Sequence, residues 1–120
     1  MRTGIAFAEI PSGFIVALET IEHQTFDELA SRIVQMVNEK KIDRLVIGSP
    51  RLLSGKEGSQ VSVVQSATDC IQKRVNLPIE FLDERYTTIV GKMAKVSDAD
   101  ARAACELLIV WLDRRKAIDN

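Results

Sequence analysis

The chain has 120 residues, which fits one domain spanning 1–120, and 46% of them are hydrophobic, enough for a sizeable core. Its 16 basic and 17 acidic residues nearly cancel, so the overall charge does not indicate a polyanion-binding protein, and nucleic-acid contact would need a local patch. No apolar run reaches the roughly 20 residues of a membrane span, and no signal-peptide pattern opens the chain. Cys70 and Cys105 lack metal-ligand spacing, which favours small buried residues in a reducing compartment and so a soluble, cytoplasmic domain.

The first two apolar runs, 3–8 and 14–18, flank a segment, 9–13, that contains a proline and a glycine. A turn of this kind between two apolar runs predicts an antiparallel hairpin. Residues 19–24 are polar in character, and we expect them to form an exit loop in which His23 has no assigned role.

Thr25 and Glu28 have the spacing of a capping box, and apolar residues at helical intervals predict a helix from there to about Lys40. The continuous apolar run 45–47 is typical of a fully buried central strand. Ser59 can cap a second helix. The expected buried face of this helix consists of Val61, Val64, Thr68, Ile71 and Val75.

A polar loop, 51–58, connects that strand to the second helix and holds Lys56 between Gly55 and Gly58. The backbone N–H groups of a glycine loop before a helix can bind a phosphate. The Gly-Lys-Ser/Thr ending of the phosphate loop in nucleotide hydrolases is absent. Simple loop flexibility is the alternative, and the sequence alone favours it.

The strand predicted over 79–82 leads directly into Asp83, Glu84 and Arg85, and Thr87 follows shortly after. In open α/β sheets, ligands bind at the carboxyl ends of strands. Adjacent carboxylates can hold a divalent cation, and an arginine can bind a phosphate through two parallel hydrogen bonds. The alternative is a solvated strand end with an Arg–Asp pair and a threonine helix cap, which this pattern alone favours.

A short helix is expected at 89–94, and Ser97 is the expected N-cap of the last helix, which has Asp98 and Asp100 in its first turn and basic residues at 114–116. The expected buried face of the last helix consists of Ala103, Ala104, Leu107, Leu108, Trp111 and Leu112. A hairpin followed by alternating helices and strands predicts the α/β class, with a mixed sheet flanked by helices.

The strand–helix–strand unit 45–82 should cross over right-handed, which places the ends of its two strands at one edge of the sheet. The start of the last helix could face the same edge. The candidate metal set is then Asp83, Glu84, Asp98 and Asp100. Metal-dependent phosphodiester cleavage needs carboxylates from separate elements, and Mg²⁺ suits such oxygen ligands. The alternative is that Asp98 and Asp100 only favour the positive end of a helix, which the sequence alone favours.

Four segments of the chain carry motifs of a known family. They are Val46-Ile47-Gly48-Ser49-Pro50 (family Val-Val-Gly-Leu-Pro), Ser54-Gly55-Lys56-Glu57-Gly58 (Gly-x-x-Gly), Leu82-Asp83-Glu84-Arg85-Tyr86-Thr87-Thr88 (Trp-Asp-Glu-Arg-Leu-Thr-Thr) and Asp100-Ala101-Arg102-Ala103-Ala104 (Asp-x-x-Ala-Ala). With these, the chain resembles over essentially its whole length the YqgF-type (RuvX-like) family of pre-16S rRNA nucleases and Holliday junction resolvases. The resemblance implies a ribonuclease H-like fold.

The beginning of the chain departs from that family, whose first strand, Gly-Ile-Asp-x-Gly, carries a metal-ligating Asp. One alignment places 4–8 on this strand, so that Ala6 replaces the Asp. The other alignment is preferred, because it runs without a gap and matches more residues. It places 2–9 on the family's second strand and 18–21 on the family's Leu-Glu-Thr-Ile motif. The first strand is then missing from this chain. Its loss would leave unpaired backbone groups beside 45–47, a gap that a partner chain or a longer N-terminus could fill.

The resemblance implies a nuclease that uses Mg²⁺ or Mn²⁺ to cut pre-16S rRNA or branched DNA, and that is weak or inactive here because the first-strand Asp is absent. The implied catalytic residues are Asp83, Glu84 and Asp100, of which Glu84 and Asp100 are metal ligands. The implied nucleic-acid-binding residues are Arg85, Lys56 and Thr87. Two alternatives stay open: a non-catalytic nucleic-acid or ribosome-associated binding module, and an interaction protein whose acids are helix caps. No membrane partner is expected.

Overall fold

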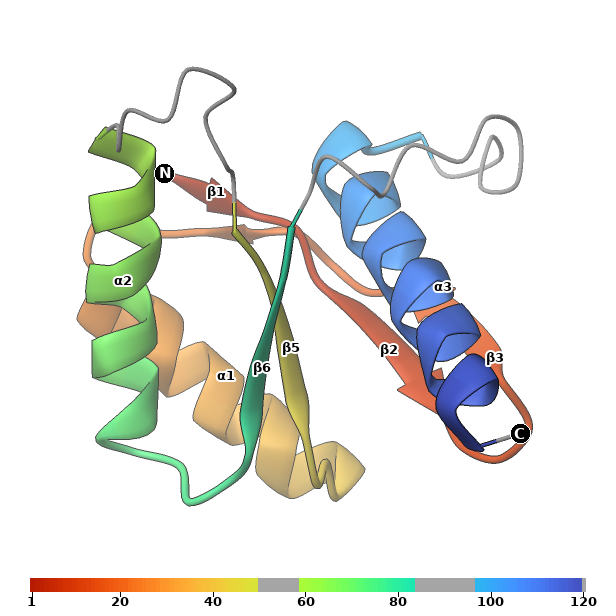
Figure 1. Cartoon of the computed structure of the whole chain (residues 1–120). Coiled ribbons are helices and arrows are strands. Elements are labelled where there is room, and N and C mark those ends of the chain that lie inside the picture. The colour runs from red at the N-terminus through yellow and green to blue at the C-terminus, as the bar shows by residue number, and fades with distance from the viewer. Residues whose placement is uncertain (50–58, 84–96, 120) are drawn as a thin grey trace. The chain divides into compact units, whose positions relative to one another are not determined.

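The computed structural model describes residues 1–49, 59–83 and 97–119, and their mixture of strands and helices confirms the predicted α/β class (Figure 1). In chain order the elements are β1 (Arg2–Thr3), β2 (Ala6–Glu9), β3 (Phe14–Ala17), β4 (Ile21–Glu22), α1 (Phe26–Lys40), β5 (Leu45–Ser49), α2 (Ser59–Gln72), β6 (Ile79–Asp83) and α3 (Ala99–Asp119). Within the described residues the strands pair as three two-stranded sheets, β1–β4, β2–β3 and β5–β6. The short helix expected at 89–94 lies outside the described residues.

The chain divides into two compact units. The first consists of Met1 and Glu22–Asp83 and contains α1, α2 and the β5–β6 sheet. The second consists of Arg2–Ile21 and the described part of Glu84–Asn120, and it contains the β2–β3 hairpin and α3. The single domain expected from the chain length stays a prediction. Among the described helices, none is both long and apolar enough to cross a membrane.

The capping box predicted at the start of α1 is confirmed. The Thr25 hydroxyl accepts a hydrogen bond from the backbone N–H of Glu28 at 3.1 Å. In return, the Glu28 carboxylate accepts from the backbone N–H of Gln24 at 3.3 Å, one residue before the cap. α1 ends at Lys40 as predicted, because Lys41 adopts a left-handed conformation (φ 54°) that closes the last turn.

The strands β5 and β6 run parallel, with Leu45 opposite Ile79 and Ser49 opposite Asp83. Because α2 connects them, the predicted strand–helix–strand unit is confirmed, and both strands end at the same edge. The expectation of a fully buried central strand is wrong for β5, whose described side chains are only half-buried. Among the described strands β5 pairs with β6 alone, so it is an edge strand there.

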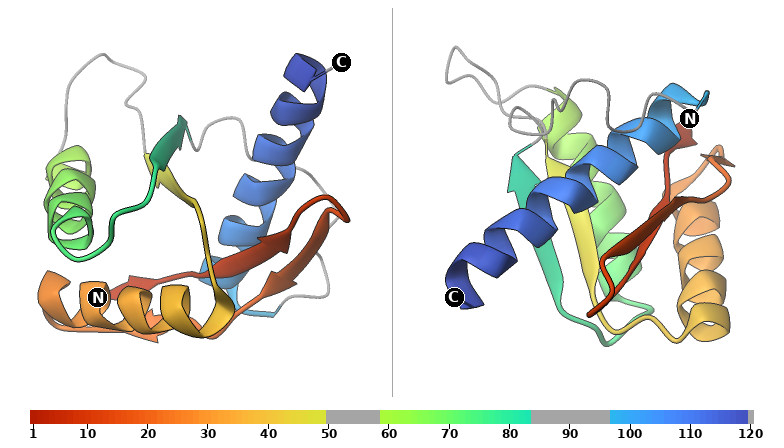
Figure 2. Two further views of the ribbon diagram at one scale, coloured as in Figure 1. Left: turned by 90° about the horizontal axis from the view of Figure 1, so that it is seen from below. Right: turned by 90° about the vertical axis from the view of Figure 1, so that its right-hand side faces the viewer.

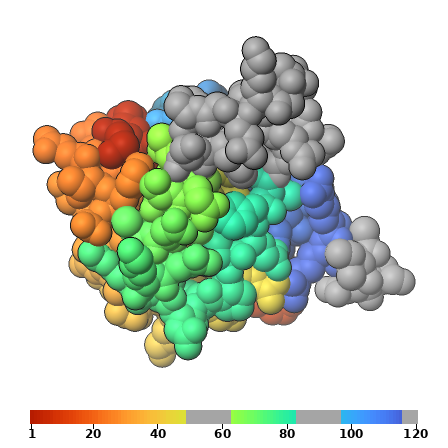
Figure 3. Space-filling view, turned by 60° about the vertical axis from the view of Figure 1, so that its left-hand side comes forward, coloured from red at the N-terminus to blue at the C-terminus, as the bar shows by residue number. Residues whose placement is uncertain are grey.

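The core of the first unit lies where α1 packs against α2. Its most buried residues there are Leu29, Ala30, Thr68 and Ile71. The buried Thr68 hydroxyl is satisfied because it donates to the carbonyl of Val64, one turn earlier, at 2.8 Å. The predicted face of α2 is thus confirmed at its centre. In the space-filling view α2 (green) covers one face of this unit beside α1 (orange to yellow) (Figure 3).

The prediction of a polar exit loop over 19–24 is wrong. Ile21–Glu22 forms the short strand β4, and the side chains of Ile21 and His23 are only 2% and 4% exposed while Glu22 is exposed. This alternation is the period of a strand. His23 is tied to the chain start, since its carbonyl accepts from the Met1 ammonium group at 2.8 Å and its N–H donates to the Met1 carbonyl at 2.9 Å.

The predicted N-terminal hairpin is confirmed as β2 and β3, which pair antiparallel from Ala6 opposite Ala17 to Glu9 opposite Phe14 (Figure 2). The turn between them contains a cis peptide bond before Pro11. Gly13 has φ 77°, a conformation that side chains disfavour, and its N–H donates to the Glu9 carbonyl at 2.8 Å.

Helix α3 packs on β2 and β3. Its side chains Ala101, Cys105 and Leu107 are 2%, 0% and 7% exposed. The predicted buried face is confirmed at Leu107 and wrong at Ala103, which is exposed. The reason is that the middle of α3 is apolar all round, so helical periodicity does not identify the side that packs. The remaining predicted residues, Ala104, Leu108, Trp111 and Leu112, are half-buried.

Candidate functional site

Asp83 is the last residue of β6, opposite Ser49 at the end of β5. The carboxyl ends of two parallel strands therefore meet at one edge, the position where α/β sheets bind ligands. This is the edge that the sequence predicted. The other predicted site residues that follow these strands lie outside the described residues: Lys56, Glu84, Arg85 and Thr87.

Asp98, a member of the candidate metal set, is the N-cap of α3, where the sequence predicted Ser97. Its Oδ1 accepts from the backbone N–H groups of Asp100 and Ala101 at 2.9 and 3.1 Å, and its carbonyl accepts the first intrahelical bond, from Arg102. The hydrogen bond from Ala101 is the main reason why the pKa of Asp98 lies below its ordinary value. The prediction of Ser97 as the N-cap is therefore wrong, and Asp98 has the role at the helix start that the sequence left as an alternative for the acids.

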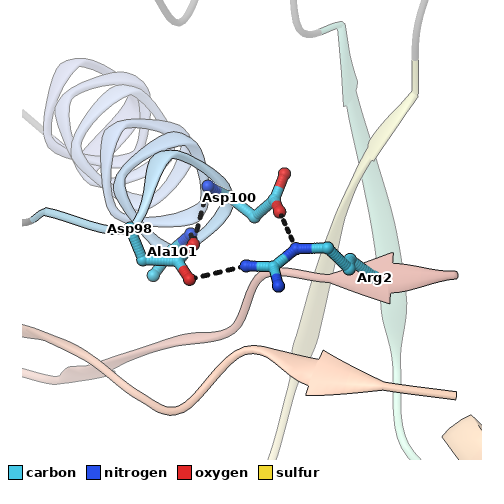
Figure 4. A network of polar contacts seen from close by, with 4 residues as sticks. All are labelled: Arg2, Asp98, Asp100 and Ala101. Carbon is cyan, nitrogen blue, oxygen red and sulfur yellow. Dashed lines mark hydrogen bonds and ion pairs between the residues drawn. The ribbon is translucent and has the colours of Figure 1, made fainter.

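Arg2 of β1 connects to both acids at the start of α3 (Figure 4). Its Nη2 lies 2.7 Å from Asp98 Oδ2, and its Nε lies 2.9 Å from Asp100 Oδ2. The side chains are 48%, 36% and 47% exposed for Arg2, Asp98 and Asp100, so solvent weakens each ion pair taken alone. The two pairs share one rigid guanidinium, which fixes the carboxylates relative to each other.

Gly4 lies against the first turn of α3 next to this ion-pair cluster. A Cβ at Gly4 would collide with the carbonyl group of Asp100 and would lie 2.8 Å from the Ala101 nitrogen. Only a residue without a side chain lets the chain after β1 approach the helix so closely. The sequence assigned no role to Arg2 or Gly4, because no local pattern around them indicates a contact with residues almost a hundred positions later in the chain.

Three of the four carboxylate oxygens of Asp98 and Asp100 are already committed, two to Arg2 and one to the helix cap. Within the described part of the chain, Asp100 Oδ1 has no hydrogen bond, so Asp100 can offer one oxygen to a cation. Both oxygens of Asp98 already accept hydrogen bonds, so Asp98 is less available to a cation than Asp100 is. Over residues 1–49, 59–83 and 97–119, no three His, Cys, Asp or Glu side chains are grouped as a metal site.

Comparison with known proteins finds relatives over nearly the whole chain. The family model for RuvX, described as Holliday junction resolvase, matches residues 1–114. A "Putative pre-16S rRNA nuclease" of Trichormus variabilis (strain ATCC 29413 / PCC 7937) is 30% identical over 125 residues, covering 96% of this chain and 83% of the relative. Proteins of the same name from Chloroflexus aurantiacus (strain ATCC 29366 / DSM 635 / J-10-fl) and Crocosphaera subtropica (strain ATCC 51142 / BH68) are 30% and 31% identical, covering 99% and 97% of this chain and 84% and 88% of the relatives.

Proposed function

Because this chain belongs to the RuvX family of Holliday junction resolvases, we propose that it is a nuclease acting on pre-16S rRNA or on branched DNA. The observation that carries the proposal is the family match over residues 1–114, together with relatives named pre-16S rRNA nucleases that match 96% or more of the chain. The β5–β6 edge supports it, since Asp83 ends its strand where α/β sheets bind ligands.

In the proposed site, Glu84 and Asp100 hold Mg²⁺ or Mn²⁺, and Asp83 assists or orients them. When bound, the cation supplies an activated water and steadies the leaving oxygen. The side chains of Lys56, Arg85 and Thr87 bind the phosphates of the nucleic acid. Asp100 is suited to its role because its Oδ1 accepts no hydrogen bond within the described residues. Asp98 supports this role because its capping hydrogen bonds hold the first turn of α3 in place. The free thiols Cys70 and Cys105 fit the cytoplasm as the place of action.

The test is cleavage of a pre-16S rRNA fragment and of a four-way DNA junction with Mg²⁺, comparing wild type with Glu84→Gln and Glu39→Gln. Glu39 lies on the exposed end of α1 and is a matched control for loss of one carboxylate. We expect weak cleavage by the wild type, the same rate for Glu39→Gln and none for Glu84→Gln. Undiminished cleavage by Glu84→Gln would show that Glu84 is not a metal ligand.

The second candidate function is a nucleic-acid or ribosome-associated binding module without catalysis. Arg2 favours it, because its guanidinium offsets one of the two negative charges that Asp98 and Asp100 would offer to a cation. In that case no variant cleaves, whereas RNA affinity is unchanged by Glu84→Gln and falls as salt concentration rises. The same samples measured by a binding assay at two salt concentrations distinguish the two functions.

A further inference from the structure

Two carboxylates at the start of α3 share a single positive charge. In Figure 4 the Arg2 guanidinium faces both the Asp98 and the Asp100 side chain and contacts each with a different nitrogen. The two distances are 2.7 Å to Asp98 and 2.9 Å to Asp100. The cluster of these three residues therefore carries one net negative charge instead of two. Charge-assisted hydrogen bonds of this length are the stronger kind.

We propose that Arg2 is an internal counter-ion that competes with a divalent cation for the negative charge of Asp100, so that Arg2 limits cation binding at this end of α3. The inference rests on the proposed function, because it concerns the cation of that same site. The resemblance to the family implies no role for Arg2, so this inference goes beyond that resemblance.

The competition follows from charge and from the number of free oxygens. Arg2 already occupies Asp100 Oδ2, which leaves Oδ1 as the oxygen available within the described structure. A cation on Oδ1 would lie close to the guanidinium, and like charges repel at such distances. Binding of the cation and the Arg2–Asp100 ion pair should therefore weaken each other by the same factor, as thermodynamic linkage requires.

The fold holds Arg2 in this position. Its strand, β1, pairs with β4 on one side. Two residues later, Gly4 allows the backbone to lie against the Asp100 carbonyl group, where a side chain would collide. Because the backbone near Arg2 is held this close to Asp100, the guanidinium stays near the carboxylate and has a high effective concentration in the competition with a cation.

The test measures Mn²⁺ binding to the full chain from the paramagnetic broadening of the Asp100 and Ala101 amide signals. In Arg2→Gln we expect Mn²⁺ to bind about tenfold more tightly than in wild type, in the range of typical couplings between sites. Arg44→Gln is the matched control, since Arg44 forms a similarly exposed ion pair with Glu80 in the first unit. We expect its Mn²⁺ affinity to equal that of wild type. Equal or weaker binding to Arg2→Gln, or no binding to any variant, overturns the proposal.

A second measurement uses the wild type alone, so it does not depend on whether a variant folds. During titration of the wild type with Mg²⁺, the side-chain Nε–H signal of Arg2 should shift with the same midpoint as the Asp100 amide. Saturation at Asp100 with an unmoved Arg2 signal overturns the proposal. Both readouts are independent of cleavage: if no variant cuts nucleic acid, the nuclease function fails, while tighter Mn²⁺ binding by Arg2→Gln still supports the counter-ion.

Discussion

Ser97 and Asp98 are neighbours, and both residue types cap helices well. The sequence favoured Ser97 because an acid stands three residues later, the spacing of a capping box. In the structure Asp98 is the cap, and its second carboxylate oxygen binds Arg2, 96 positions away in the chain. Local patterns could predict that a cap lies here but not which residue forms it, because both neighbours have good capping side chains, and the ion pair with Arg2 has no local signal.

Gly4 is the residue at which the close approach of chain and helix can be tested. Gly4→Ala should destabilise the protein by about 3 kcal/mol, because the added methyl group collides with the rigid backbone of Asp100. The measurement is the free energy of unfolding from urea titration.

Gly13→Ala is the control for this substitution. No atom lies within 4 Å of a Cβ at Gly13, so its cost of about 1 kcal/mol comes only from the positive φ. Equal costs for the two substitutions would mean that Gly4 does not pack against Asp100 as described.

At the scale of elements, the sequence predicted what local signals control. The β2–β3 hairpin has its proline and glycine turn, and α1 has its capping box. The β5–β6 pair has one continuous apolar run, 45–47, and one apolar run with a single Glu inside it, 79–82. β4 was missed because a two-residue strand is too short to show alternation by itself. The buried side of α3 was predicted only in part, because its packing against β2 and β3 selects one of several apolar faces.

Cys105 tests that packing chemically. It is fully buried, and burial, aided by the nearby charge of Glu106, raises the pKa of its thiol. We expect a thiol reagent at neutral pH to label the half-buried Cys70 first and to label Cys105 only when α3 opens or the protein unfolds. Labelling of Cys70→Ser and Cys105→Ser, followed by mass spectrometry, assigns the two rates. Cys105 reacting as fast as Cys70 would mean that α3 is not packed on the hairpin.

At the scale of the whole molecule, the resemblance to the RuvX family is confirmed by the family match over residues 1–114. The meeting of the β5 and β6 ends was also predictable, since parallel strands joined by a helix end at one edge. The Arg2 cluster was not, because it joins the first residues of the chain to the start of the last helix. The assigned roles of Lys56, Glu84, Arg85 and Thr87 stay predictions, since these residues lie outside the described part of the chain.

The central claim is that Glu84 and Asp100 share one divalent cation. Titration with Mg²⁺ followed by backbone NMR tests it most directly, using wild type and Glu84→Gln. We expect the amide signals of Glu84 and Asp100 to shift with one common midpoint in wild type, and the Asp100 shift to be lost in Glu84→Gln. An Asp100 shift that is unchanged in Glu84→Gln, or a response at only one of the two residues in wild type, would contradict the claim.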